Sequence, residues 1–333
     1  MQQPVDFQKL FADFSGLKIG VLGDVMLDTY WWGHVDRISP EAPVPVVALD
    51  HKEYRIGGAG NVALNLSCLG ASVSVLSVIG QDDDGRSLSN LFATNGIATD
   101  HLISVPDRIT TSKSRIISRN QQMMRLDSEL TADLKNTEEK MLLDAVENYL
   151  KEEKPKALIF EDYNKGVLTE NVIRQTIDLC KKYGVLTTVD PKRKNFLTYE
   201  GVDIFKPNLK EVKEGLNMLI DDINDEVLRE IHLQLLSRLN HQISFITLSE
   251  KGVYYQQGMN RRIIPSHVRN IADVSGAGDT VIAVASLVYA STRNIDLMAS
   301  VANIAGGLVC EEVGTVAINK QKLLEECQLL LRN

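Results

Sequence analysis

Short runs of apolar residues alternate along the chain with longer segments in which apolar positions recur every three or four residues. The short runs predict buried β-strands and the longer segments predict helices. This alternation is typical of an α/β fold with a mainly parallel sheet covered by helices. Strands are predicted at Lys18–Gly23, Val73–Ile79, Ala157–Phe160, Val185–Val189, Asp203–Phe205, Ile243–Leu248 and Val253–Gln256, and helices at Asn61–Leu69, Glu170–Tyr183 and about Thr280–Tyr289.

Two stretches break this pattern. Residues Tyr30–Ile56 contain three prolines and alternating valines, and Ile109–Asp127 is strand-like but polar. Neither stretch resembles a strand-helix-strand unit, so together they predict a small sheet beside the main one. The sequence has no repeat and no clear linker, and we expect one domain over residues 1–333.

Composition narrows the classes of function. The chain is 44% hydrophobic and has a net charge of −8, which gives no general attraction to nucleic acid or to an anionic membrane. An anionic ligand would therefore be small and held by a few local cations. Met1–Asp13 lacks the features of a signal peptide, and the apolar run Thr280–Thr292 is shorter than the roughly 20 residues of a membrane span. We expect a cytoplasmic protein.

The four cysteines form no Cys-x-x-Cys pair, which argues against zinc and a disulfide framework.

The segment Asp273–Thr280 carries the most informative chemistry. Gly276, Ala277 and Gly278 form a flexible turn at the start of an apolar helix, where backbone N–H groups and the helix dipole favour an anion such as phosphate. Asp279 adds a negative charge to this place. It is explained either as the N-cap of the helix or as a base that takes a proton from an attacking hydroxyl.

Aspartates follow three of the predicted strands, at Asp24, Asp162 and Asp190. Ligands of open α/β sheets bind at the carboxyl ends of the strands. Each aspartate alone is more simply a loop cap, but three at one edge favour a ligand with many hydroxyl groups, such as a sugar.

The segment Gly57–Ala63 opens a helix with a spacing that imitates a dinucleotide fingerprint. A dinucleotide site would lie in the first strand-helix-strand unit, with an acidic residue about 20 positions further on. Ser77 and Val78 stand there instead. We prefer a close approach of the backbone to a ligand, with Asn61 bonding a hydroxyl; glycines needed only for entry into the helix are the alternative.

The segment Asn208–Glu211 lies at a predicted helix start. Glu211 could hold water around a magnesium ion, but from the spacing alone a favourable acidic first helical turn is the preferred explanation. Lys192, Arg193 and Lys194 follow Asp190, and at least one of them could meet a phosphate. The chain has neither a Walker A loop nor a protein-kinase His-Arg-Asp loop, and its six histidines form no metal or triad pattern.

The motifs Gly57–Ala63, Asn208–Glu211 and Asp273–Thr280, in this order along the chain, resemble those of the ribokinase-like (PfkB) sugar kinases. The resemblance spans nearly the whole chain and implies ATP, Mg²⁺ and a β-sheet lid made from about residues 30–56 and 109–127. It makes Asp279 the base and the amides of Gly276–Gly278 an anion hole. By the same resemblance the sugar faces Asp24, Asp28, Gly57, Gly58, Asn61 and Arg125, the nucleotide contacts Asn208, Ser249, Lys251, Gly252 and Asn303, and Asp273 and Ser275 are candidates for binding a monovalent cation such as K⁺.

A narrower resemblance is to the kinase domains that phosphorylate D-glycero-D-manno-heptose 7-phosphate at its anomeric hydroxyl during lipopolysaccharide synthesis. It rests on Gly23–Asp28, Arg37–Val47, Ser118–Gln122 with Arg125 and Asp127, and the Asp162-Tyr163-x-Lys165-Gly166 motif. The substrate phosphate would then be held by some of Arg37, Arg119, Lys165 and Lys192.

No nucleotidyltransferase motif occurs, so the resemblance implies that a separate nucleotidyltransferase acts afterwards. A homodimer through the lid is a further expectation. The alternatives are a kinase for another sugar, a non-catalytic sugar or nucleotide sensor on the same fold, and a nicotinamide oxidoreductase that rests only on Gly58 and Gly60.

Overall fold

A computed structural model describes residues 5–119, 121–220 and 222–331 of the chain. Its centre is a ten-stranded sheet in the order β14-β13-β12-β11-β10-β9-β1-β4-β5, with β6 paired to β4. The pairs from β12 to β5 are parallel, and only β13 and β14 run antiparallel to their neighbours. The strands are β1 (Lys18–Gly23), β4 (Ser72–Gly80), β5 (Ile97–Ala98), β6 (Leu102–Val105), β9 (Ala157–Glu161), β10 (Leu186–Asp190), β11 (Ile204–Phe205), β12 (Ile243–Thr247), β13 (Val253–Gln257) and β14 (Asn260–Ile264).

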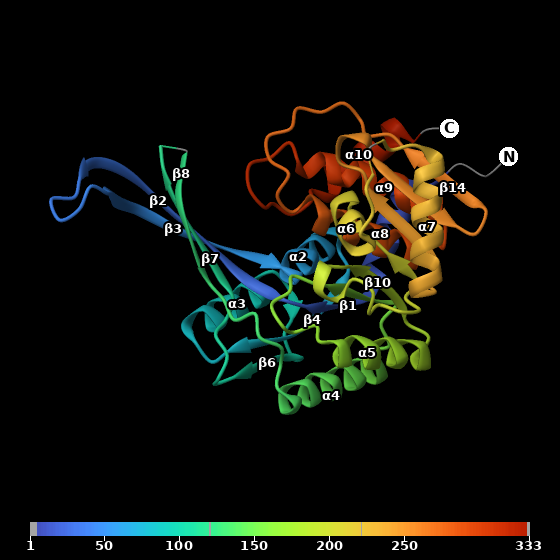
Figure 1. Cartoon of the computed structure of the whole chain (residues 1–333), viewed down its shortest axis with the longest axis horizontal. Helices are drawn as coiled ribbons and strands as arrows, with labels where there is room; N and C mark the ends of the chain where they lie inside the picture. Colours follow the sequence, from blue (N-terminus) through green and yellow to red (C-terminus); the bar gives the residue numbers. More distant parts are fainter. Residues whose placement is uncertain (1–4, 120, 221, 332–333) are drawn as a thin grey trace.

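Helices cover both faces of this sheet, which confirms the predicted architecture (Figure 1). Successive strand residues point to opposite faces. Ile159 of β9 therefore packs in one core and Phe160 in the other. The first core includes side chains of α1 (Phe7–Asp13), α2 (Ala59–Leu69), α3 (Asp83–Thr94), α8 (Ala277–Thr292), α9 (Ile295–Val309) and α10 (Lys320–Leu330). The second includes those of α4 (Asn136–Glu153), α5 (Glu170–Tyr183), α6 (Leu209–Leu216) and α7 (Asp225–Leu239).

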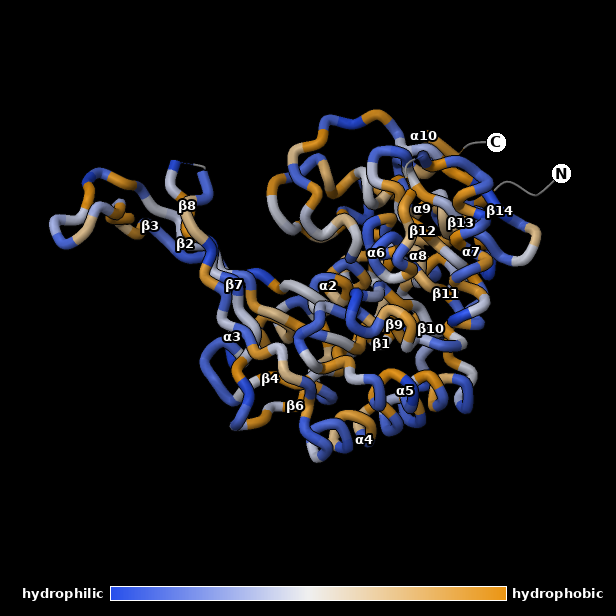
Figure 2. The backbone as a smooth tube through the Cα atoms, in the orientation of Figure 1, coloured by the Kyte–Doolittle hydropathy of each residue, from blue (hydrophilic) through white to orange (hydrophobic). Residues whose placement is uncertain are grey.

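The distribution of apolar residues agrees with this layered arrangement. Figure 2 shows the apolar residues gathered where β1, β9, β10 and β11 pass between the helices, while the outer loops are largely hydrophilic. Within the described ranges, every helix is too short or too polar to span a lipid bilayer.

A separate four-stranded sheet projects from the body (Figure 1). Its order is β3-β2-β7-β8, formed by Val25–Ile38 (β2), Pro45–Gly58 (β3), Ser112–Ser118 (β7) and Gln121–Ser128 (β8). The predicted small sheet is therefore present. It begins earlier than expected, because β2 starts at Val25 and β3 continues to Gly58, so the sugar-side glycines belong to this sheet. Asn120 of the expected motif lies outside the described residues.

Candidate functional site

The glycine turn at the start of α8 brings Asp279 to the edge of the main sheet. Gly276 has φ 77°, a conformation that favours glycine, and is itself the residue that precedes the first helical turn. Asp279 is the third residue of α8, with Ala277 and Gly278 before it. The N-cap interpretation of Asp279 is therefore wrong, because a cap residue lies outside the helical turn.

The Asp279 carboxylate is held from two sides. The side-chain amide of Asn61 in α2 donates to Oδ2 at 2.7 Å, and the hydroxyl of Tyr163 donates to Oδ1 at 2.7 Å. The side chain is almost completely buried, and this burial raises the pKa of Asp279 to about 6. A carboxylate whose pKa lies near neutrality and whose position is fixed is suited to accept a proton at physiological pH.

Asn61 is in turn fixed by Asn65, one helical turn further along α2. The Asn65 amide donates to the backbone oxygen of Asn61 at 2.8 Å. Its own oxygen accepts from the hydroxyl of Thr280 at 3.2 Å and from the backbone N–H of Ile318 at 2.9 Å. Asn65 thereby ties α2 to α8 beside the base.

The glycine pair before α2 is explained by close packing at the base of the small sheet. A Cβ at Gly57 would lie 2.6 Å from Oδ2 of Asp28, and one at Gly58, which has φ 60°, would lie 2.4 Å from the backbone oxygen of Asp24. The pair ends β3 and does not follow a strand of the main sheet. This position differs from that of a dinucleotide fingerprint.

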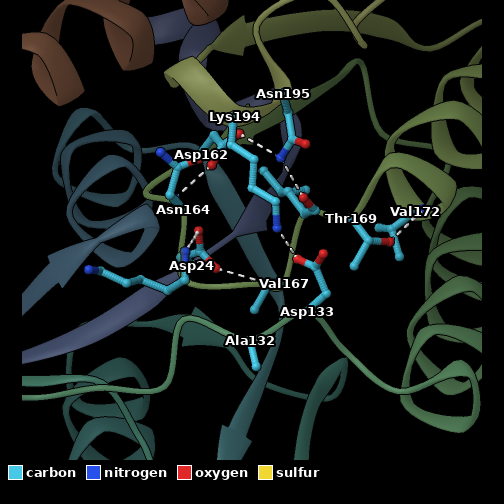
Figure 3. Close-up of polar contacts among 12 residues, drawn as sticks. Asp24, Ala132, Asp133, Asp162, Asn164, Val167, Thr169, Val172, Lys194 and Asn195 are labelled. Carbon is cyan, nitrogen blue, oxygen red and sulfur yellow. Dashed lines mark hydrogen bonds and ion pairs between the residues drawn. The ribbon is translucent and has the colours of Figure 1, made fainter.

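Two of the three strand-end aspartates serve as anchors for loops (Figure 3). Asp24 accepts the backbone N–H groups of Tyr163 and Lys165 at Oδ2 and of Val167 at Oδ1, at 2.9–3.0 Å. Both oxygens are used and the residue is only 1% exposed, so Asp24 anchors this loop, and its contact with a sugar stays a prediction.

Asp162 is likewise a structural residue. It accepts the backbone N–H of Asn164 at 2.8 Å, the amide of Asn195 at 3.2 Å and the hydroxyl of Tyr199 at 2.8 Å. Its side chain is fully buried, and its contact with a substrate likewise stays a prediction. For both residues the observed contacts are those of the loop-cap alternative.

Asp190, the third strand-end aspartate, lies in a cluster of charged side chains. Its Oδ2 is 2.8 Å from Nζ of Lys206, and its Oδ1 is 3.4 Å from Nζ of Lys192. Burial opposes ionisation, but the two ammonium groups outweigh it and hold the pKa of Asp190 below its usual value. The cluster also contains Glu161, from which one carboxylate oxygen lies within 4.8 Å of oxygens of Asp190 and Asp279.

The Asn208–Glu211 motif forms the start of α6. The Asn208 side chain accepts the N–H of Glu211 at 2.9 Å, and Oε2 of Glu211 accepts the N–H of Asn208 at 2.8 Å. Oε1 of Glu211 is 2.6 Å from Nζ of Lys192. Each oxygen of Glu211 thus already has a partner. The remaining lone pairs of these oxygens fit a contact with a magnesium ion through a bridging water.

On the sugar side, Asp28 is almost buried at the inner end of β2 and receives a hydrogen bond of 2.8 Å from the Arg115 guanidinium of β7. Arg125 lies on β8 and is exposed, with both hydrogen bonds going to Asp127 at 2.7 and 2.9 Å. The structure places Asp28, Gly57, Gly58 and Asn61 close together, and Arg125 on the projecting sheet.

The four cations predicted to hold a phosphate lie at four different places. Lys192 lies in the acidic cluster, and Lys165 has Nζ 2.6 Å from Oε2 of Glu129. Arg37 is near the far end of β2, and Arg119 lies between β7 and β8 with φ 49°. The structure does not bring these four side chains together.

The predicted nucleotide residues lie around two loops. Ser249 and Lys251 form a short 3₁₀ turn after β12, and Gly252 follows with φ 94°, where a Cβ would lie 2.1 Å from the backbone oxygen of Ile264. Asn303 of α9 donates to the backbone oxygen of Pro265 at 2.8 Å. Asn303 and Gly252 therefore both contact the segment after β14.

Asp273 connects the catalytic loop to a second loop. Its Oδ1 accepts the backbone N–H and the hydroxyl of Ser275 at 3.0 and 2.8 Å, and Oδ2 accepts the N–H of Gly314 at 2.9 Å. Three donors already occupy this carboxylate, so a monovalent cation here would be bound mainly by oxygens of the neighbouring backbone.

Four functional candidates escaped the sequence reasoning: Glu161, Tyr163, Lys206 and Arg115. The sequence contains one signal for Glu161. Strand alternation places it on the same buried face as Ile159, which is unusual for a glutamate. Tyr163 lies within a quoted motif but had no role assigned. The ion pairs of Lys206 and Arg115 depend on contacts between distant segments, and nothing local marks them.

Comparisons with known proteins agree with this geometry. The model of the pfkB family of carbohydrate kinases matches residues 17–322. The chain is 36% identical over 318 residues to the bifunctional protein HldE of Geobacter sulfurreducens, covering 95% of this chain and 64% of that protein. It is 39% identical over 305 residues to HldE of Aliarcobacter butzleri, covering 92% of this chain and 63% of that protein. The chain thus spans less than two thirds of the length of these relatives.

Solved structures share the fold. Phosphofructokinase-2 from Escherichia coli in complex with potassium superimposes with a TM-score of 0.76 at 18% identity, covering 93% of this chain and 99% of that one. Ribokinase of Arabidopsis thaliana complexed with ribose and ATP gives a TM-score of 0.70 at 16% identity with the same coverage. With the family model matching almost the whole chain, the protein belongs to the pfkB family of carbohydrate kinases.

Proposed function

We propose that this protein is an ATP-dependent kinase that phosphorylates D-glycero-D-manno-heptose 7-phosphate at C1 and gives the 1,7-bisphosphate, a precursor for the lipopolysaccharide core. The observation that carries the kinase assignment is Asp279. Its carboxylate is buried, has a pKa raised to about 6 and lies at the start of α8 beside the glycine turn. Similarity to two HldE proteins supports the heptose substrate.

Each part of the site has a defined task in this proposal. Asp279 accepts the proton of the attacking anomeric hydroxyl, while Asn61 and Tyr163 keep the carboxylate in place. The amides at Gly276–Gly278, together with the helix dipole, stabilise negative charge on the transferring phosphoryl group. Asp28 bonds a sugar hydroxyl, and the small sheet covers the sugar and excludes water from the reaction.

ATP and Mg²⁺ accompany this activity. When bound, Mg²⁺ neutralises charge on the ATP phosphates. Ser249, Lys251, Gly252, Asn303 and Asn208 are proposed to surround the nucleotide. Asp273 and Ser275 are the proposed place of a K⁺ ion; a potassium complex of the similar phosphofructokinase-2 is known.

Two partners follow from the proposal. A nucleotidyltransferase would use the product of the kinase. A second copy of this chain would pair through the small sheet, which exposes the apolar side chains of Ile38, Val44, Leu49, Met124 and Leu126.

The deciding experiment is product-resolved ³¹P NMR with ATP and heptose 7-phosphate, compared with fructose 6-phosphate and ribose. We expect the new signal at C1 of the heptose and a higher kcat/KM for heptose 7-phosphate than for the other two sugars, because buried groups that bond hydroxyls discriminate against a sugar that leaves them unpaired. A higher kcat/KM for another sugar would keep the kinase assignment and remove the heptose. Binding of sugar and ATP without turnover would favour a sensor.

A further inference from the structure

The side chain of Arg269 is buried in a segment that is otherwise mostly exposed. Residues 265–276 connect β14 to α8 without a helix or strand, and Val268 and Ile271 within them are exposed. The side chain of Arg269, in contrast, is only 8% exposed. A Cβ at Gly307 of α9 would lie 2.9 Å from Cδ and Nε of Arg269, so this glycine makes room for the arginine against the helix. Arg269 therefore has a defined place in the fold.

Two carboxylates from separate elements bind the Arg269 guanidinium. Nη1 donates to Oε1 of Glu311, which lies just after α9, at 2.8 Å. Nη2 donates to Oε2 of Glu326 in α10 at 2.5 Å. Hydrogen bonds between a charged donor and a charged acceptor are stronger than neutral ones, and these carboxylates are partly buried. Arg269 thus links the exposed segment to both α9 and α10.

Further contacts continue from Arg269 toward the start of α8. The backbone N–H groups of Ala272 and Asp273 both donate to the backbone oxygen of Cys310, at 2.8 and 3.2 Å. Oδ2 of Asp273 accepts the N–H of Gly314 at 2.9 Å. These contacts hold one side of the segment against the loop after α9, and the glycine turn begins three residues beyond Asp273. The position of the turn therefore depends on how firmly this segment is held.

We propose that Arg269 is a positioning residue that keeps the Gly276–Gly278 turn in place for phosphoryl transfer. It acts through the segment that leads to the turn. An anion hole is effective only when its N–H groups are already fixed where negative charge develops. Without the two ion pairs the segment would open more readily at Ala272 and Asp273, because regions with few buried contacts have low local stability. The effect on catalysis rests on the proposed function, whereas the holding of the segment does not.

The first test is hydrogen–deuterium exchange of the full chain without nucleotide or sugar, measured by mass spectrometry. Arg269→Met keeps an unbranched side chain and removes the charge, and should make exchange in peptides covering residues 270–276 at least tenfold faster. Peptides of α5 should exchange as in wild type. Arg262→Met is the matched control, because it removes an exposed ion pair of 3.0 Å with Asp296, between β14 and α9. Its exchange over residues 270–276 should stay within twofold of wild type.

The second test is steady-state kinetics with the sugar that the wild-type protein phosphorylates. Arg269→Met should lower kcat at least tenfold and change the KM for the sugar less than threefold, because Asp28 and Asn61 lie on other elements, β2 and α2. Arg269→Lys should give an intermediate kcat, because lysine lacks the fork that binds two carboxylates. Arg262→Met should keep a normal kcat.

A double variant tests whether Arg269 acts through α10. Glu326→Gln removes one of the two ion pairs and should lower kcat less than Arg269→Met does. The double variant should be no slower than Arg269→Met alone, because both substitutions remove the same contact. Effects on kcat that multiply would overturn the proposal.

Two further results would also overturn it: exchange over residues 270–276 that is unchanged in Arg269→Met, or faster exchange with an unchanged kcat. A thermal unfolding curve verifies that each variant is folded, and Glu326→Gln alone carries both measurements if Arg269→Met does not fold. If the wild-type chain phosphorylates no sugar and Arg269→Met still exchanges faster, the proposed function fails and the holding of the segment is supported.

Discussion

At the scale of residues, aspartates that look alike in sequence have different tasks. Asp24 and Asp162 follow strands as Asp190 does, but they are occupied by backbone and side-chain donors. Local sequence could not separate them, because all partners of Asp24 and the side-chain partners of Asp162 come from segments far along the chain. Asp279 differs in its place, because it lies in the first turn of α8 directly after the Gly276 turn, and burial raises its pKa to about 6.

Asp279→Asn should lower kcat by about 10²–10⁴ with little change in ATP affinity, because the amide keeps the shape but cannot act as a base. Steady-state kinetics and nucleotide titration measure the two quantities. We expect the variant to be at least as stable as wild type, because it removes a buried charge near Asp190. A folded variant with near-normal kcat would remove Asp279 from the role of base.

At the scale of elements, strands and helices with a strong apolar pattern were predicted well. The strand Lys18–Gly23 and the helix Glu170–Tyr183 agree with β1 and α5 in full. The two-residue strand β5 and the polar β14 escaped, because short or polar edge strands carry little periodic signal. The site was predicted less completely. Strand order brings Lys206 to Asp190, and loop packing brings Tyr163 to Asp279, and neither is visible in the local sequence.

The four cations predicted to hold the substrate phosphate belong to different elements, so single substitutions can tell them apart. Of Arg37→Ala, Arg119→Ala, Lys165→Ala and Lys192→Ala, at least one should lose about 1.5–3 kcal/mol in kcat/KM for heptose 7-phosphate and much less for free heptose, as expected for one charge-assisted contact. Lys210→Ala, which removes an exposed lysine of α6, is the control. Equal effects on both sugars in all four variants would contradict a phosphate site built from these residues.

At the scale of the whole molecule, the packing of α7 against the main sheet includes polar contacts that sequence reasoning missed. The six histidines form no metal or triad pattern in the sequence, but His232 of α7 and His241 before β12 both contact the Ser244 hydroxyl, at 2.8 and 2.7 Å. Burial, with the nearby His232, lowers the pKa of His241 to about 3. The folded protein therefore keeps His241 neutral.

This histidine should make stability depend on pH. Its pKa is about 6.5 in the unfolded chain, so the unfolded state takes up the proton first as the pH falls. The contribution of His241 to the free energy of unfolding is therefore present above pH 6.5 and is lost as the pH falls toward 3. Between pH 7 and pH 5 the free energy of unfolding should fall by about 2 kcal/mol for this reason. Urea unfolding at pH 7 and pH 5 should show this decrease in the wild-type protein. In His241→Gln the decrease between the two pH values should be smaller by about 2 kcal/mol. An unchanged pH dependence in the variant would contradict the shift.

The anchor at Asp24 also bears on how a substitution scan of this protein would read. Asp24 accepts the backbone N–H of Tyr163, and the hydroxyl of Tyr163 is bonded to Asp279. A shift of that loop would therefore also move the hydroxyl that fixes the Asp279 carboxylate. A scan scored by turnover alone would thus rank Asp24 together with the proposed base Asp279. Only a scan that also scores folded yield would separate the residue that holds the loop from the proposed base.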